Sequence, residues 1–316
     1  MANRTRALAR AFTGLTLITY LLVVLGAVVR ARGAGLACPD WPLCFGELVP
    51  ALDFGVILEW GHRALAGSVS LLLVGLSAWM YQDRRAWAAC RGLLGVSFMV
   101  LALQVVLGGL TVLKLLASWT VTSHLLVGNL FGVCLTLLSA RLFEVAQEQD
   151  GPVRSAPVSP ALQGLAWGVA GLYLAQMTLG GLVSSRFAGL VCPQWPACAG
   201  DMFFPSFGGL LGLQLTHRLV AYALTFAIAA LAWGAWDHPR LGGRSRLLLL
   251  LVIVQVALGI ANVLLRLPVE VTALHSATAA ALGAATALVV RDAARARTAP
   301  PLAAAPTPAA LPEIVA

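Results

Sequence analysis

The sequence has few charged residues. Only 11% of its 316 residues are Asp, Glu, Lys or Arg, whereas a soluble globular protein carries about 25%. Hydrophobic residues make up 59%, and the mean hydropathy is +0.87, which is too apolar for a disordered chain. The arginines lie between apolar blocks and not along one basic face, so the net charge of +8 does not indicate nucleic-acid binding. This composition indicates an integral membrane protein.

Eight apolar segments are each long enough to cross about 30 Å of hydrocarbon as a helix. They are expected at about 11–29, 60–81, 93–113, 119–141, 161–184, 212–236, 247–265 and 270–290. The runs are too continuous for the alternating strands of a membrane barrel. The sequence therefore predicts an all-α integral membrane protein with eight transmembrane helices.

Arginine and lysine are divided unequally between the two ends of these segments. Fourteen lie at the end that carries both termini, namely Arg4, Arg6, Arg10, Arg84, Arg85, Arg91, Arg141, Arg154, Arg240, Arg244, Arg246, Arg291, Arg295 and Arg297. Seven lie at the other end, namely Arg30, Arg32, Arg63, Lys114, Arg186, Arg218 and Arg266. Because basic residues favour the cytoplasmic side, we expect a multi-pass protein of a bacterial cell membrane with both termini in the cytoplasm.

The chain is a tandem repeat. Residues 25–48, LGAVVRARGAGLACPDWPLCFGEL, align with residues 179–202, LGGLVSSRFAGLVCPQWPACAGDM. The segment LEWGHRALA at 58–66 aligns with LQLTHRLVA at 213–221. Further matched pairs are Gln104 with Gln255, Gly108 with Gly259, and His124 with His275. Four spans per repeat give both halves the same topology, so two four-helix bundles related by a pseudo-two-fold axis along the membrane normal are expected.

The repeat also divides the chain into domains. The N-terminal half is expected at 1–143 and the C-terminal half at 161–291. Between them, residues 144–160 form a polar, proline-containing cytoplasmic linker. Residues 292–316 are rich in alanine and proline, and we expect them to be a disordered cytoplasmic tail.

Four histidines occupy equivalent places in the second, fourth, sixth and eighth segments, near the outer face. They are His62, His124, His217 and His275. The residue four positions after each is Ala or Gly, which leaves room on the same helix face for a flat ligand, although small residues are also common at membrane helix contacts. Ionisable residues inside a membrane mark function by default. Two histidines from facing helices suit a haem iron, whereas zinc normally takes more ligands.

The two halves differ in one acidic residue. Glu59 precedes His62 by three residues and shares its helical face, but the matching residue in the second half is Gln214. A carboxylate beside a haem pocket can relay protons or stabilise positive charge, so Glu59 is the candidate catalytic residue; a glutamate reaching interfacial water is the alternative. Arg63 and Arg218 directly follow histidines and are candidate contacts for haem propionates, with a lipid-headgroup contact as the alternative.

Each outer loop carries two cysteines in the pattern C-P-x-W-P-x-C. The pairs are Cys38 with Cys44 and Cys192 with Cys198. Oxidising surroundings favour a disulfide within each loop, and two prolines and a tryptophan make a short, stiff loop. A redox-active pair that delivers electrons is the alternative.

Together these residues resemble the haem A synthase family. The resemblance covers about residues 10–290 and rests on E-x-x-H-R at 59–63, the second H-R at 217–218, His124, His275 and the paired loop cysteines. It implies an oxidoreductase that oxidises the C8 methyl group of haem O to the formyl group of haem A by two successive hydroxylations, for cytochrome oxidase. It also implies a permanent haem b on His217 and His275, and haem O as substrate between His62 and His124.

The partners follow from the same resemblance. They are membrane lipid, haem O, the haem O synthase that supplies it, and an electron donor that is a quinol or a small redox protein; small-residue helix faces would also permit a homo-oligomer. The alternative function is a di-haem b-type electron-transfer protein linked to quinol, and a haem chaperone is a third. The common depth of the four histidines counts against a transmembrane electron carrier, which usually places its haems at two depths.

Overall fold

The chain folds into eight long α-helices. The computed structural model describes residues 2–148 and 156–295. The helices are α1 (Ala2–Ala31), α2 (Phe54–Tyr81), α3 (Arg84–Leu113), α4 (Ser118–Glu148), α5 (Pro160–Ser185), α6 (Gly209–Gly234), α7 (Leu241–Leu264) and α8 (Val269–Arg295). All eight are long and apolar enough to cross a membrane. The prediction of an all-α chain with eight spanning helices is therefore confirmed.

The helices extend beyond the apolar segments expected from the sequence. α1 begins at Ala2 and not near residue 11, and α4 continues to Glu148, into the stretch expected as a linker. α8 likewise continues to Arg295, past the start of the expected tail; the rest of the tail, 296–316, lies outside the described residues. Hydropathy marks only the part of a helix inside the hydrocarbon, while the intrahelical hydrogen bonds continue into the polar region.

Side-chain caps fix where several helices begin. The carboxylate of Asp53 accepts a hydrogen bond from the backbone N–H of Val56 at the start of α2. Asp83 does the same for α3 through the N–H groups of Arg85 and Ala86. Ser159 caps α5, whose first residue is a proline. These are the residue types that satisfy unpaired N–H groups at helix starts.

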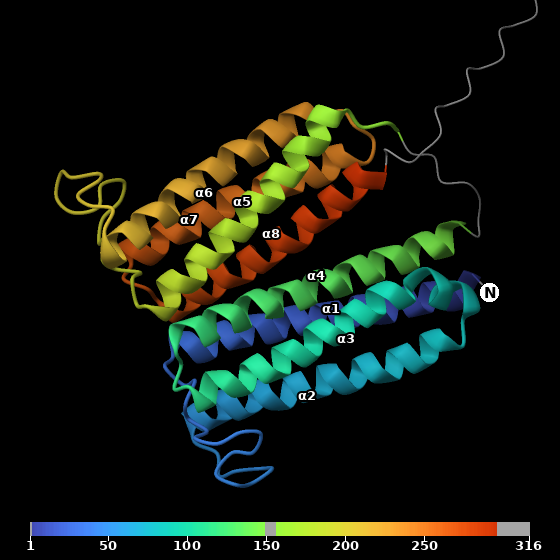
Figure 1. Cartoon of the computed structure of the whole chain (residues 1–316), viewed down its shortest axis with the longest axis horizontal. Coiled ribbons are helices and arrows are strands. Elements are labelled where there is room, and N and C mark those ends of the chain that lie inside the picture. Colours follow the sequence, from blue (N-terminus) through green and yellow to red (C-terminus); the bar gives the residue numbers. More distant parts are fainter. Residues whose placement is uncertain (1, 149–155, 296–316) are drawn as a thin grey trace, which may run out of the picture.

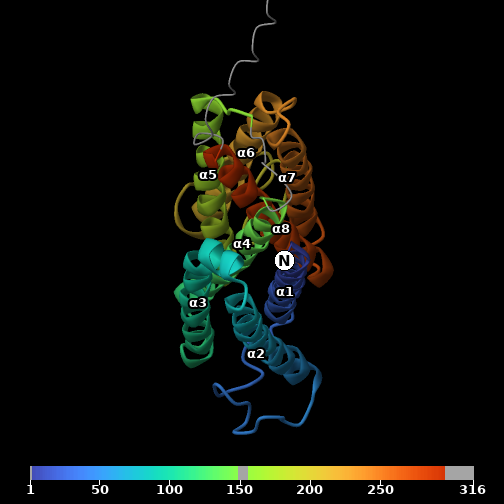
Figure 2. The ribbon, with the colours of Figure 1, turned by 90° about the vertical axis from the view of Figure 1, so that its right-hand side faces the viewer.

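The helices form two groups, α1–α4 and α5–α8, that lie against each other (Figures 1 and 2). Within the first group α1 packs on α2 and α4, and α3 packs on α2 and α4; the second group repeats these neighbours with α5–α8. Each group has its own buried apolar core. The groups meet through contacts of α1 with α8, α4 with α5, and α4 with α8.

The two ends of the helices differ. The loop end carries the long loops 32–53 and 186–208, which protrude on the same side of the molecule in Figure 1. The terminus end carries the start of α1 and the end of α8. At the loop end, Thr122 and Ser185 hydroxyls hydrogen-bond between α4 and α5 at 3.1 Å. Midway, the Tyr20 hydroxyl of α1 donates to the carbonyl of Ala277 in α8 at 2.9 Å.

An ion-pair cluster joins the two groups at the terminus end. Glu144 of α4 forms ion pairs with Arg291 and Arg295 of α8 and with Arg141 of its own helix. The side chains of Glu144 and Arg291 are only 13% and 12% exposed. Because the pair is largely buried, removal of one partner leaves the other charge poorly compensated.

We expect Glu144→Gln to destabilise the protein by about 2–3 kcal/mol, because it leaves the largely buried Arg291 guanidinium without its anion. Glu148→Gln is the matched control: Glu148 is half exposed and, among the described residues, pairs only with Arg141, so its loss should change stability by less than about 1 kcal/mol. Denaturant unfolding of both variants in the same detergent measures the difference. Equal losses from the two variants would show that the cluster does not hold the helix groups together.

Candidate functional site

The four predicted histidines lie near the loop end, each about two turns into its helix. His62 and His217 are the ninth residues of α2 and α6, and His124 and His275 are the seventh residues of α4 and α8. His62 and His124 are close enough to interact electrostatically, and so are His217 and His275. The structure thus brings the histidines together as one pair in each helix group.

Each histidine ring packs against a glycine of the preceding helix. The pairs, with the distance from a hypothetical glycine Cβ to the ring Cε1 atom, are Gly26–His62 at 3.0 Å, Gly108–His124 at 3.1 Å, Gly180–His217 at 3.2 Å and Gly259–His275 at 3.2 Å. A real Cβ atom at these distances would require the ring to shift. Glycine is therefore the residue that lets each imidazole lie between two helices.

Three of the four rings also contact a glutamine amide. The Nε2–Nε2 distances are 3.3 Å for Gln104–His124, 3.4 Å for Gln176–His217 and 3.2 Å for Gln255–His275. Which group donates depends on the ring tautomer and on which way the amide is turned, and among the described residues the contact leaves Nδ1 as the ring nitrogen without a partner. Each glutamine begins the sequence Q-x-x-L-G, whose glycine touches the same ring.

The fourth site departs from this pattern. Leu22 stands where the glutamine would be, four residues before Gly26, and among the described residues His62 has no side-chain amide partner. The sequence analysis matched Gln104 with Gln255 but assigned them no role, and it missed Gln176. The repeated Q-x-x-L-G was the signal that would have found them.

The space beside His124 is filled by one of these glutamines. A Cβ on Gly128 would lie 2.8 Å from the amide nitrogen of Gln104. The clearance for a flat ligand, expected from the small residue four positions after the histidine, is thus taken up by this amide at His124.

The histidines and the glutamines beside them have buried polar atoms without hydrogen-bond partners. Among the described residues, Nδ1 of all four histidines is buried and makes no hydrogen bond, and the same holds for the amide oxygens of Gln104, Gln176 and Gln255. Repeated unsatisfied polar atoms require an explanation such as a bound group. No cluster of three or more His, Cys, Asp or Glu that could hold a metal occurs within 2–148 and 156–295. Two imidazoles per half fit the two axial positions of a haem iron better than a zinc site.

Glu59 links α2 to the first loop, residues 32–53. Its side chain lies one helical turn before His62 and is buried. One carboxylate oxygen accepts a hydrogen bond from the backbone N–H of Cys38 at 2.8 Å, and the other pairs with Arg63 at 2.5 Å. In the second half, Gln214 instead donates weakly to the carbonyl of Gly189 at 3.4 Å.

Arg63 and Arg218 hold the backbones of the two cysteine loops. Arg63 donates to the carbonyl oxygens of Asp40 at 2.7 Å, Leu43 at 2.6 Å and Cys38 at 3.2 Å. Arg218 donates to those of Cys192 at 2.8 Å and Ala197 at 3.3 Å. Both guanidinium groups were candidate contacts for haem propionates, with a lipid-headgroup contact as the alternative, and this stays a prediction. Within the described residues both contact these loops, and Arg63 also pairs with Glu59.

The loops themselves are closed by disulfides, Cys38–Cys44 and Cys192–Cys198, as the sequence predicted. The carboxylate of Asp40 accepts hydrogen bonds from the backbone N–H groups of Gly46 and Phe45, and these bonds lower its pKa below the ordinary value. A disulfide thus closes each loop, and Asp40 adds two backbone hydrogen bonds within the first.

The tryptophans of the two loops have different neighbours. Trp41 packs against α3, where a Cβ on Gly109 would lie 3.1 Å from its ring. Trp195 of the second loop donates its indole N–H to the hydroxyl of Tyr222 in α6 at 3.0 Å. The first loop therefore reaches from α2 to α3, the helix that contacts His124.

The sequence matches the cytochrome oxidase assembly protein family COX15-CtaA over residues 9–55 and 52–287. The chain belongs to this family. A curated relative named Heme A synthase, from Shewanella oneidensis, is 32% identical over 85% of this chain and 91% of its own. Relatives of the same name from Symbiobacterium thermophilum and Geobacillus kaustophilus are 31% and 27% identical, over 73% and 84% of this chain and 76% and 85% of theirs. The family match includes all four histidines, Glu59 and both loops.

We expect Glu59→Ala to loosen the first loop, because the Cys38 N–H loses an anionic acceptor. A hydrogen bond to a charged group contributes about 1.5–3 kcal/mol, so hydrogen exchange at the Cys38 amide should accelerate at least tenfold. Exchange measured by mass spectrometry on peptides covering residues 36–46 tests this. Gln214→Ala is the control, since the Gln214 amide donates only to Gly189 and should leave exchange at Cys192 nearly unchanged. Unaltered hydrogen exchange at Cys38 would show that Glu59 does not stabilise the first loop.

Proposed function

We propose that this protein is a haem A synthase, a membrane oxidoreductase that converts the C8 methyl group of haem O into the formyl group of haem A. Family membership and relatives of this name along most of the chain support the reaction. The proposal rests on one observed difference between the two otherwise matched histidine pairs. The pair formed by His62 and His124 has an acidic residue, Glu59, one helical turn before His62, whereas Gln214 stands at the matching place before His217.

We infer that the halves 1–143 and 161–291 are related by a pseudo-two-fold axis along the membrane normal. A two-fold axis would place α5–α8 on α1–α4 and the reverse. The contact of α1 with α8 would then have a counterpart between α5 and α4, and the contact of α4 with α8 would map onto itself; the structure has all three contacts. The matched glycine–histidine contacts support the same relation. The distribution of arginines supports both termini in the cytoplasm and the histidines near the outer face.

The C-terminal half is the half that would hold haem b permanently. His217 and His275 are the candidate iron ligands, and each has a glutamine amide, from Gln176 or Gln255, that fixes its ring. A retained cofactor benefits from ligands that are already held in place. When bound there, haem b supplies one-electron redox chemistry.

The N-terminal half is the half that would take haem O, between His62 and His124. Leu22 leaves His62 without the side-chain amide contact of the other three rings, and the Leu22 backbone contacts the His62 ring instead. A substrate must enter and leave, so a ligand without a side-chain amide contact suits this half. The first loop, held by Glu59 and Arg63 and resting on α3 through Trp41, lies over the same pair.

Glu59 has a defined role in this chemistry. Each hydroxylation places one atom of O₂ on the carbon and reduces the other to water, which consumes two electrons and two protons. The electrons come from an external donor, a quinol or a small redox protein. The Glu59 carboxyl group, one turn from His62, is the group proposed to deliver protons, and its contacts with Cys38 and Arg63 fix where its oxygens stand.

The comparisons do not support the di-haem electron-transfer alternative, because the curated relatives carry the name Heme A synthase. The placement of all four histidines at the loop end also gives no chain of redox sites across the membrane.

We expect Glu59→Gln to lower haem A formation by at least about a hundredfold, because loss of a proton-transferring group typically reduces rates 10²–10⁴-fold. Its haem b content should stay at the wild-type level. Gln214→Glu, the reverse change at the matched position, should keep most of the activity. The measurement is chromatography of haems extracted from protein made in a host that supplies haem O. Normal haem A yield from Glu59→Gln would remove Glu59 from the mechanism, and haem b alone from the wild type would favour an electron carrier.

We expect Gln255→Leu to speed the loss of haem b roughly fivefold, because the amide contact to His275 contributes about 1 kcal/mol. Leu22→Gln introduces the missing amide beside His62 and should make the N-terminal half retain haem O longer, with haem b unaffected. Transfer of each haem to apomyoglobin, followed by absorbance, measures both rates. Identical release rates in both variants and the wild type would show that the glutamines do not hold the ligands.

A further inference from the structure

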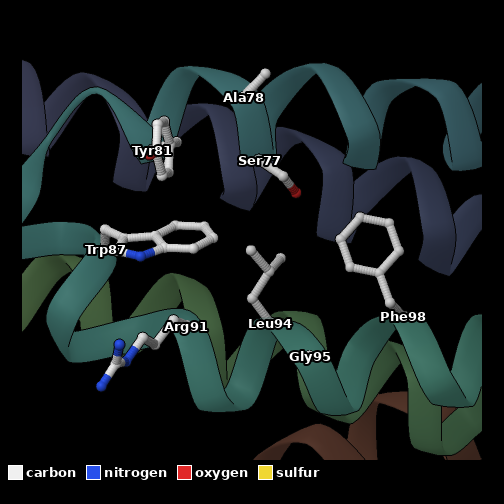
Figure 3. Close-up of a pocket in the computed structure, with 8 residues that line it drawn as sticks. All are labelled: Ser77, Ala78, Tyr81, Trp87, Arg91, Leu94, Gly95 and Phe98. Atoms are coloured by element: carbon white, nitrogen blue, oxygen red, sulfur yellow. The ribbon is translucent and has the colours of Figure 1, made fainter.

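A groove between α2 and α3 lies at the terminus end, away from the histidines (Figure 3). It has a cavity volume of about 340 Å³, within the range of small-molecule sites. Its lining residues are Ser77, Ala78 and Tyr81 of α2, and Trp87, Arg91, Leu94, Gly95 and Phe98 of α3. None of these residues belongs to the sites described above.

The groove is polar at one end and apolar at the other. Tyr81, Trp87 and Arg91 stand beside the α2–α3 turn, while Leu94 and Phe98 stand further along α3 (Figure 3). Phe98 lies eleven residues after Trp87 in one helix, or about 16 Å deeper along its axis. Tryptophan and tyrosine favour the membrane interface, so the polar end lies at headgroup level and the apolar end in the hydrocarbon.

The polar end has donors that the chain does not use. Among the described residues, the Arg91 guanidinium has no ion-pair partner, and the Tyr81 hydroxyl and the Trp87 indole N–H make no hydrogen bond. The rings of Tyr81 and Trp87 meet edge to face with centroids 5.1 Å apart, which fixes the wall of the groove. The Ser77 hydroxyl donates to the carbonyl of Leu73 in its own helix, so the deeper part offers no free donor.

The charge around the turn is positive. Arg84 and Arg85 begin α3 next to Arg91. The nearby acid, Asp83, already accepts hydrogen bonds from the Thr5 hydroxyl and from two backbone N–H groups of α3. Basic pockets between membrane helices attract anionic headgroups.

We propose that this groove is a binding site for one anionic phospholipid. The phosphate lies at Arg91 and Trp87, and an acyl chain runs along Ala78, Leu94, Gly95 and Phe98. The length of the apolar part favours a lipid over a water-soluble phosphate compound, and the unpaired arginine favours an anionic lipid over a zwitterionic one.

The test is native mass spectrometry of the full-length protein released from nanodiscs that contain equal parts of phosphatidylglycerol and phosphatidylcholine. Wild-type protein should retain one phosphatidylglycerol in preference to phosphatidylcholine. Arg91→Gln should lower that preference roughly tenfold, as expected for loss of a charge-assisted hydrogen bond. The control is Arg246→Gln, because Arg246 of α7 lies over the Trp236 ring at the same end of the molecule and lines no part of the groove.

A second pair of variants tests the apolar part. Gly95→Leu fills the groove, and Gly92→Leu places the same side chain on the same helix outside it; a Cβ on either glycine would meet no atom within 4 Å, so both should fold. Gly95→Leu should abolish lipid retention and Gly92→Leu should not. Equal retention of both lipids by wild type, or equal behaviour of either variant and its control, would overturn the proposal. Displacement of the lipid by excess inorganic phosphate would show that only the phosphate is recognised and would also overturn it.

Discussion

The contact between an imidazole ring and a glycine on the neighbouring helix is the constraint on which the structure depends. A polar ring inside the membrane must have partners within the protein. Glycine lets two helices approach until the ring fills the space between them, and this happens at Gly26, Gly108, Gly180 and Gly259. Each of these contacts joins two helices that are consecutive in the chain, so each helix that carries a histidine is packed against the helix before it.

Repetition of that contact makes the differences between the halves informative. His62 differs from the other three histidines in having Leu22 in place of a glutamine, and from its repeat mate His217 in having Glu59 in place of Gln214. Both changes lie beside His62, and the contact of its ring with Gly26 is kept. Two sites built on the same glycine–histidine contact can thus differ in the polar side chains around one histidine.

The sequence predicts the features that follow from a regular pattern, because hydropathy reports burial in lipid and the repeat aligns residues of the same role. The eight helices, the four histidines and both disulfides are of this kind. Helix ends do not follow from such a pattern. For example, α4 continues to Glu148 through charged residues that hydropathy places outside the membrane. The contacts of Arg63 could not be predicted either. Its acceptors are backbone carbonyls about 20 residues earlier, and every residue has a carbonyl, so the residue types do not indicate which ones accept.

The two ends of the helices have different physical roles: ion pairs lie at one end, and the histidines and long loops lie at the other. α3 has 30 residues and α4 has 31, which corresponds to about 45 Å, so the ion pairs of Glu144 lie far from the histidines. Strong, largely buried pairs at the terminus end can hold the helix groups together without restricting the loop end. A site that admits and releases a large substrate needs that freedom. The first loop is hydrogen-bonded to side chains of one helix, α2, through Glu59, Trp60 and Arg63, so a local movement of α2 can release these bonds together.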